Sequence, residues 1–208
     1  MIIDHKWKMT AYFILEPVAD DEFIFINKSD YPEWLAEKTF LGEEIKEDLV
    51  IKLFCENDRL KKTDFIAGIL PILIISTRFK NIIESFLIEN IQFFSVEIIH
   101  GKDIDNSYWY LHTINNVDAF DWMQSDYIAE TWDDVNKKVI EWNPTTISNI
   151  PQNEIATIGE LKKTVLDVSK IQSRVVFRVT HIEHLLICNE MIANKIIFNR
   201  NQIDPYLV

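Results

Sequence analysis

The stretch that decides the fold is residues 64–121, which read DFIAGILPILIISTRFKNIIESFLIENIQFFSVEIIHGKDIDNSYWYLHTINNVDAFD. Its first part, residues 69–75 (ILPILII), is too apolar to have one wet face and predicts a buried strand. Pro71 has no backbone N–H to give to a sheet, so we place it at the start or edge of that strand.

An amphipathic helix is expected directly after this strand. Ser76 and Thr77 offer side-chain oxygens that can cap its first turn. The following apolar residues recur at the spacing of one helix face, which predicts that they are buried: Phe79, Ile82, Ile83, Phe86 and Leu87. Asn90 is the expected end of the helix, because asparagine tolerates the left-handed conformation that ends many helices.

Two strands follow the helix. Residues 91–99 and 108–115 are rich in β-branched and aromatic side chains, and the turn-forming segment between them, HGKDIDNS, predicts a hairpin with a long loop. Both faces of the second strand are partly apolar, which favours a central position in the sheet.

Outward from this stretch, the chain alternates strands with a few helices. Further strands are expected at residues 11–19, 23–27, 47–55, 137–142, 173–180 and 185–187, and the alternative for the first two is one strand and a bend. Short helices are expected after Tyr31-Pro32-Glu33-Trp34, within 155–163, and from Asn189, as its cap, to about Phe198. This order predicts an α+β fold with a mixed, largely antiparallel sheet and a few packed helices. A chain of 208 residues fits one domain spanning 1–208, with residues 1–62 as an alternative smaller N-terminal lobe.

Charge and composition narrow the function classes. The formal net charge is −12, from 33 acidic and 21 basic residues, which disfavours a nucleic-acid partner and suits a basic one. Cys55 and Cys188 lie in apolar surroundings, as expected of buried thiols in a reducing compartment. Asp4 interrupts the region where a signal peptide needs an apolar core, and no run is long enough to cross a membrane. We therefore expect a cytoplasmic protein with no membrane partner.

The sequence contains no recognisable catalytic or cofactor-binding motif. The four glycines are isolated, which excludes a glycine-rich phosphate loop and a nucleophile elbow. We expect a protein that is not an enzyme and holds no cofactor. The alternative is a metal-binding module or an enzyme of unknown reaction that uses His181, His184 and Cys188. These three share one face if the segment is helical, but the flanking residues favour strands and no fourth ligand is evident.

The strongest candidate for a binding surface is the segment 118–142, in which acidic residues alternate with tryptophan and tyrosine. Aromatic side chains of this kind are enriched at interface hot spots, and nearby carboxylates can steer a basic partner. The alternative is that the aromatic residues are core and the acids are solvated surface. The expected partner-binding residues are Asp118, Asp121, Trp122, Asp126, Tyr127, Glu130, Trp132, Asp133 and Asp134.

The central stretch resembles a family of immunity proteins of bacterial polymorphic-toxin systems, formerly catalogued as a domain of unknown function. The resemblance lies in an aspartate-aromatic opening, an apolar strand ending in serine, a short helix, an Asn-aromatic strand, a tyrosine-led strand and a C-terminal strand-helix unit. The residues that carry it are Asp64, Phe65, Ile74–Ser76, Asn90, Gln92–Phe94, Val96, Glu97, Asn115, Val117, Asp118, Asp121 and Leu185–Phe198. Ser95 stands where the pattern has proline, and the late glycine before Phe198 is missing. The resemblance implies a protein that binds and neutralises a cognate toxin; self-association stays open.

Overall fold

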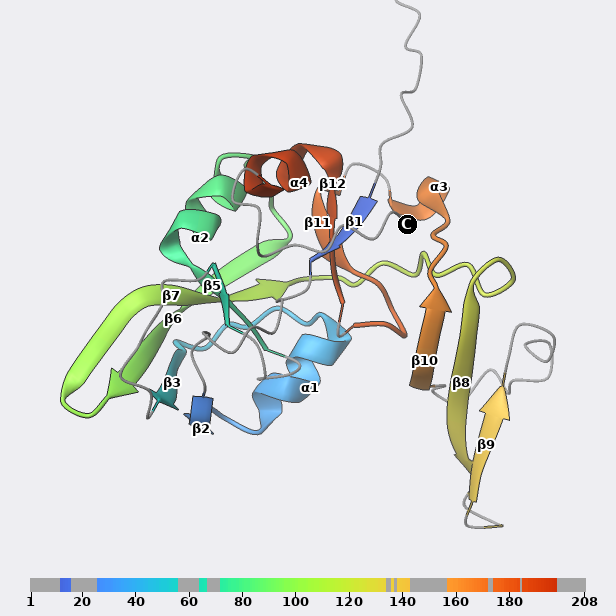
Figure 1. The fold of residues 1–208 in the computed structure, drawn as a ribbon, viewed down its shortest axis with the longest axis horizontal. Helices are drawn as coiled ribbons and strands as arrows, with labels where there is room; N and C mark the ends of the chain where they lie inside the picture. Colours follow the sequence, from blue (N-terminus) through green and yellow to red (C-terminus); the bar gives the residue numbers. More distant parts are fainter. Residues whose placement is uncertain are drawn as a thin grey trace, which may run out of the picture.

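A six-stranded sheet forms the centre of the computed structural model, which describes residues 12–15, 26–55, 64–66, 72–133, 136, 138–142, 157–171, 174–183 and 185–197 (Figure 1). Its order is β2-β3-β6-β7-β5-β4, and every pair is antiparallel except β3 and β6. The strands are β2 (Ile26–Asp30), β3 (Val50–Cys55), β4 (Phe65–Ile66), β5 (Leu73–Ser76), β6 (Ile91–His100) and β7 (Asp103–Thr113). The predicted central position of the tyrosine-led strand is confirmed, because β7 pairs with β6 and β5.

The β6–β7 hairpin corrects the expectation of a long loop. His100 pairs with Asp103 and Ile99 with Ile104, so only two residues, Gly101 and Lys102, form the turn. Gly101 has a φ of 57°, a left-handed conformation that glycine adopts without steric cost. The polar residues of the segment DIDNS therefore continue the strand, because pairing with β6 overrides their preference for turns.

Helices cover both faces of this sheet. On one face α1 (Trp34–Leu41) buries Leu35 with Ile51, Ile98 and Tyr110. On the other, α2 (Thr77–Glu84) and α4 (Glu190–Ile197) lie together (Figure 1). Both predicted caps are confirmed: the Ser76 hydroxyl accepts from the Phe79 amide at 3.1 Å, and the Asn189 side chain accepts from the Ile192 amide at 3.2 Å.

The end of α2 differs from the prediction. Phe79 and Ile83 are buried as expected, but the helix stops at Glu84 rather than near Asn90. Leu87 takes the left-handed conformation, with a φ of 52°, and its side chain is 88% exposed. The apolar spacing continued past Glu84, but tightened turns that bond Phe86 to Ile83 and Leu87 to Glu84 end the helix first.

The described residues also form two three-stranded sheets. One has the order β1-β12-β11, from β1 (Tyr12–Leu15), β12 (Leu186–Asn189) and β11 (Val176–Arg178). The other has the order β10-β8-β9, from β8 (Asp126–Asp133), β9 (Lys138–Trp142) and β10 (Thr157–Lys163), and α3 (Val168–Ile171) follows it. The prediction of a short helix within 155–163 is wrong: residues 157–163 form β10, because pairing with β8 decides their conformation. The strands and helices are those of an α+β fold with a largely antiparallel, mixed sheet, as predicted.

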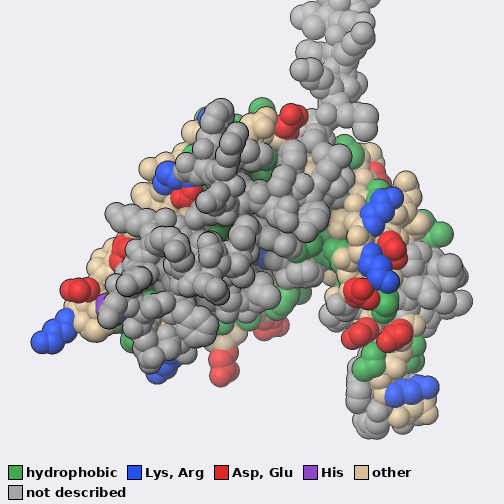
Figure 2. Space-filling view, viewed as in Figure 1, with side chains coloured by type: hydrophobic (Ala, Val, Ile, Leu, Met, Phe, Trp, Pro, Cys, Tyr) green, Lys and Arg blue, Asp and Glu red, His purple; other side chains and the backbone are tan. Residues whose placement is uncertain are grey.

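The β10-β8-β9 sheet projects away from the six-stranded sheet (Figures 1 and 2). Among the described residues an apolar cluster attaches it, in which Tyr127, Ala129 and Ile158 pack with Phe120 and Phe177. Both cysteines are buried, as the sequence predicted. Among the described residues, every helix is too short or too polar to cross a membrane.

Candidate partner-binding surface

The two faces of the β10-β8-β9 sheet differ in character. Side chains alternate along a strand, so Tyr127 and Ala129 of β8 point into the apolar cluster and are buried. Asp126 and Glu130, on the opposite face, are exposed. The same backbone that anchors the sheet therefore presents carboxylates to solvent.

Strand pairing brings more carboxylates to this outer face. Glu130 lies directly opposite Glu141 of β9, and Ile128 lies opposite Glu160 of β10. Residues paired across antiparallel strands project to the same face, so Glu130, Glu141 and Glu160 gather there. We call the acidic sheet face the set of Asp126, Ile128, Glu130, Val139, Glu141 and Glu160.

Few cations offset these charges. Asp126 lies opposite Lys163, and Glu160 is 3.9 Å from Lys162. Within the described part of the chain, no lysine or arginine forms an ion pair with Glu130 or Glu141. Two like charges directly opposite each other destabilise a sheet, so this pair weakens the isolated protein.

The turn before β8 is fixed by one predicted residue, Asp121. One of its carboxylate oxygens accepts from the amides of Met123 and Gln124, each at 3.0 Å, and the other accepts from the Gln124 side chain at 2.6 Å. Desolvation opposes ionisation, but these hydrogen bonds, mainly from Gln124, outweigh it and lower the pKa of Asp121. Asp121 therefore shapes the turn.

The predicted aromatic residues of this region stabilise the attachment of the sheet. The Trp122 ring packs edge-on against Phe120, Tyr127 and His181, with centroid distances of 4.9, 5.3 and 4.8 Å. Trp122 is half-buried, whereas Tyr127 is buried and burial raises its pKa to about 12. Trp122 keeps some surface for a partner, and Tyr127 offers almost none.

The structure describes the remaining predicted residues only in part. Asp118 is exposed and lies 3.6 Å from Lys170 of α3. Trp132 and Asp133 pair with Val139 and Lys138 in the backbone ladder, and their side chains lie outside the described residues, as does Asp134. The structure thus brings Asp126 and Glu130 together on one face and separates them from Asp118 and Asp121.

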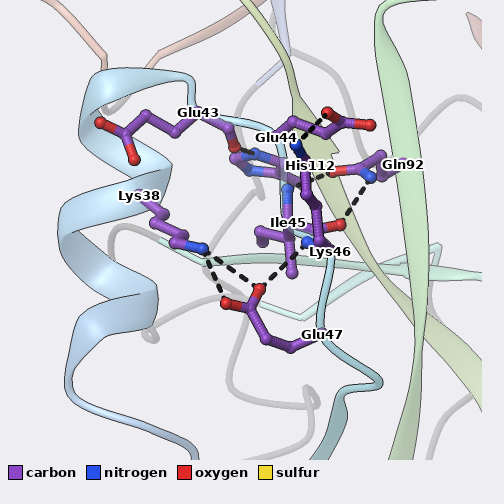
Figure 3. Close-up of polar contacts among 8 residues, drawn as sticks. All are labelled: Lys38, Glu43, Glu44, Ile45, Lys46, Glu47, Gln92 and His112. Atoms are coloured by element: carbon purple, nitrogen blue, oxygen red, sulfur yellow. Dashed lines mark hydrogen bonds and ion pairs between the residues drawn. The ribbon is translucent and has the colours of Figure 1, made fainter.

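A second acidic region lies between α1 and β3. We call residues 42–49 the anchored loop, because side chains beneath it bind its backbone (Figure 3). The Gln92 amide group both accepts from the Ile45 N–H and donates to the Ile45 carbonyl, each at 2.9 Å. Lys38 contacts both carboxylate oxygens of Glu47 at 3.1 Å, and this hydrogen bond is the main reason that the pKa of Glu47 is lowered.

His112 holds the same loop from the buried side. Its Nε2 lies 2.6 Å from the Glu43 carbonyl oxygen, which can only accept, so Nε2 carries the proton (Figure 3). Its Nδ1 then accepts from the Tyr110 hydroxyl at 2.9 Å, and that hydroxyl meets Thr39 at 2.6 Å. Burial is the main cause of the lowered pKa of His112, with Arg178 and Lys38 adding to it. The imidazole is therefore neutral at pH 7.

The residues of the alternative metal hypothesis occupy different surroundings. His181 lies in a turn against Trp122, whereas Cys188 is fully buried in the apolar cluster beneath α2 and α4. Burial raises the pKa of the Cys188 thiol to about 12, so it stays protonated. The part of the chain that the structure describes holds no group of three or more metal-ligand side chains. The hypothesis depends on His184, which lies outside that part, and it stays a prediction.

Two parts of this surface were missed from the sequence. Glu160 was missed because a short helix was expected within 155–163, and Glu141 lies in the segment 118–142 but was not among the expected partner-binding residues. Only the strand register places Glu160 and Glu141 next to β8, and the register cannot be deduced from the local sequence. The anchored loop was also missed, although EEIKED (43–48) is a dense acidic run that could have drawn notice.

Comparison with known proteins identifies the family. No curated protein matches the chain. The model of the Immunity protein family (Imm11) matches residues 39–201, which include the six-stranded sheet from β3 onward and the whole acidic sheet face. The match covers well over half of the chain and agrees with the resemblance found in residues 64–121. The chain therefore belongs to the Immunity protein family (Imm11).

Proposed function

We propose that this protein binds and neutralises a cognate toxin of a polymorphic toxin system through the acidic sheet face. Family membership supports the immunity role, and the cross-strand pair Glu130–Glu141 is the observation that supports this surface. The exposed Val139 adds apolar contact area beside the carboxylates. Neutralisation proceeds by binding in the cytoplasm, without catalysis by this chain.

The physical argument is that toxin binding would remove the repulsion between Glu130 and Glu141. In the isolated protein, two carboxylates face each other across β8 and β9 without a described cationic partner. A lysine or arginine from the toxin placed between them would replace repulsion by attraction. Complementary charge would also accelerate encounter and make the association rate fall with salt. We therefore infer a toxin with a basic contact surface.

The test is the affinity of the toxin for charge-neutralised variants. The toxin candidate is the protein encoded beside this chain, and toxicity relieved by this chain would identify it. Glu130→Gln and Glu141→Gln keep the size of each side chain and remove its charge. Each should weaken toxin binding about tenfold or more, with most of the loss at low salt.

Glu44→Gln is the matched control, because Glu44 is an exposed acid of the anchored loop. It should leave affinity unchanged. If Glu44→Gln weakens binding and both sheet variants do not, the toxin binds the anchored loop, and the acidic sheet face is not the interface.

A further inference from the structure

Leu87 is an apolar residue that the fold leaves exposed to solvent. The helical spacing of the sequence predicts it in the core, yet it is 88% exposed. Its backbone has a φ of 52°, in the region that side chains with a Cβ adopt reluctantly. An apolar residue that is both strained and exposed conflicts with local preference, and such conflicts concentrate at functional positions.

Leu87 lines two hollows. One has a volume of about 520 Å³ and is lined mainly by apolar side chains, among them Ile83, Ile88, Ile91 and Phe93. The other has a volume of about 370 Å³ and includes Phe86 and Val175. Leu87 borders both, so one patch carries a protruding apolar side chain and an apolar hollow beside it.

We propose that this patch binds a second copy of the chain about a twofold axis. In a twofold interface each copy offers the same surface, so the patch must be complementary to itself. A protrusion next to a hollow meets that condition, because Leu87 of each copy enters the hollow of the other. Association would remove both Leu87 side chains from water, which explains why the chain holds this residue in an exposed, left-handed conformation.

Charge favours a second copy over the basic toxin at this patch. Glu84 is paired with Lys80 at 2.6 Å, and Lys195 lies over the Phe86 ring. Arg174 lines the same hollow as Glu89. The patch is therefore close to neutral on a chain of net charge −12, which makes it a place where two like-charged copies can meet.

The location leaves the acidic sheet face accessible. In Figure 1, α2 lies at the upper left and the β10-β8-β9 sheet at the lower right, at opposite ends of the molecule. A dimer formed through Leu87 can bind two toxin molecules without competition.

The test is the molar mass of the full chain, measured by sedimentation and light scattering over a range of concentrations. The wild type should reach twice 24.6 kDa, and Leu87→Asp should remain at 24.6 kDa under the same conditions. Val168→Asp is the control, since Val168 of α3 is 57% exposed and lies away from the patch; it should dimerise like the wild type. Leu87→Gly should also lose dimerisation while raising the melting temperature of the monomer, because glycine relieves the left-handed conformation.

A monomeric wild type at about 100 μM, a concentration at which weak specific dimers form, would overturn the proposal. So would a Leu87→Asp variant that still dimerises. If the wild type is monomeric and Leu87→Asp weakens toxin binding, Leu87 belongs to the toxin interface and the twofold contact is wrong. Because toxin affinity is measured separately, loss of this proposal leaves the acidic sheet face to be judged by its own variants.

Discussion

The anchored loop and the acidic sheet face are both rich in carboxylates, but the protein treats them in opposite ways. In the anchored loop, Gln92 and His112 bind the backbone and Lys38 offsets Glu47 (Figure 3). On the acidic sheet face, Glu130 and Glu141 are held opposite each other by strand register. The first region contributes to stability, and the second costs stability.

This difference teaches how to interpret acidic segments. A run such as EEIKED (43–48) looks like a binding surface in the sequence, yet its backbone and part of its charge are already used within the fold. Residues far apart in sequence, Glu130, Glu141 and Glu160, form the cluster that we propose as the toxin-binding surface. Regions kept for binding are expected to lower the stability of the free protein.

The largest effect should come from Gly42→Ala in the anchored loop. Gly42 has a φ of 64°, and an added Cβ would lie 2.8 Å from the backbone nitrogen of Asn116, which cannot move aside like a flexible side chain. We expect a loss of about 3 kcal/mol in the free energy of unfolding, measured by urea titration.

Gly101→Ala is the matched control, because Gly101 is also left-handed, with a φ of 57°, but has open space around it. It should cost only about 1 kcal/mol. Equal losses for the two variants would show that Asn116 does not constrain the start of the anchored loop.

A smaller loss is expected from Gln92→Met. Methionine keeps the length of the side chain but leaves the Ile45 N–H and carbonyl without their partner. The expected cost is about 2 kcal/mol, with faster hydrogen exchange at the Ile45 amide. Ser95→Ala, at an exposed position of the same strand, should leave both quantities unchanged.

Next in size is the pH dependence contributed by His112, since one titrating ring is involved. Its pKa is lowered in the folded state, mainly by burial, so the unfolded chain binds the proton more tightly than the folded protein does. The unfolded chain takes up this proton as the pH falls below about 6.5, the ordinary pKa of histidine. Stability should therefore fall as pH drops below 6.5. We would measure the free energy of unfolding by urea titration at pH 7.5 and at pH 5.5. Between these two pH values it should fall less in His112→Gln than in the wild type. An equal fall would show that His112 is not a source of it.

Local signals predicted the parts of the fold that depend on neighbours in sequence. Ser76 and Asn189 cap helices because a side-chain oxygen reaches an amide three residues ahead, which the sequence displays directly. The strands β6 and β7 were also evident, since their β-branched and aromatic residues suit a half-buried sheet.

The features that were not predicted from the sequence depend mainly on contacts between residues far apart in the chain. Residues 157–163 form β10 because β8 lies beside them, and the helix through Leu87 stops early although its apolar spacing continues. Of the predicted site, Asp126 and Glu130 lie on one exposed face, whereas Tyr127 is core. Alternation along β8 explains that division, but only the register adds Glu141 and Glu160.

The most direct test of the account measures both stability and toxin affinity for one variant, Glu141→Lys. A lysine opposite Glu130 replaces a like-charge pair by an opposite-charge pair. We predict that the free energy of unfolding rises by about 0.5 kcal/mol and that toxin affinity falls. A variant that is more stable and still binds the toxin as tightly as the wild type would contradict the claim that the repulsion between Glu130 and Glu141 is kept for the toxin.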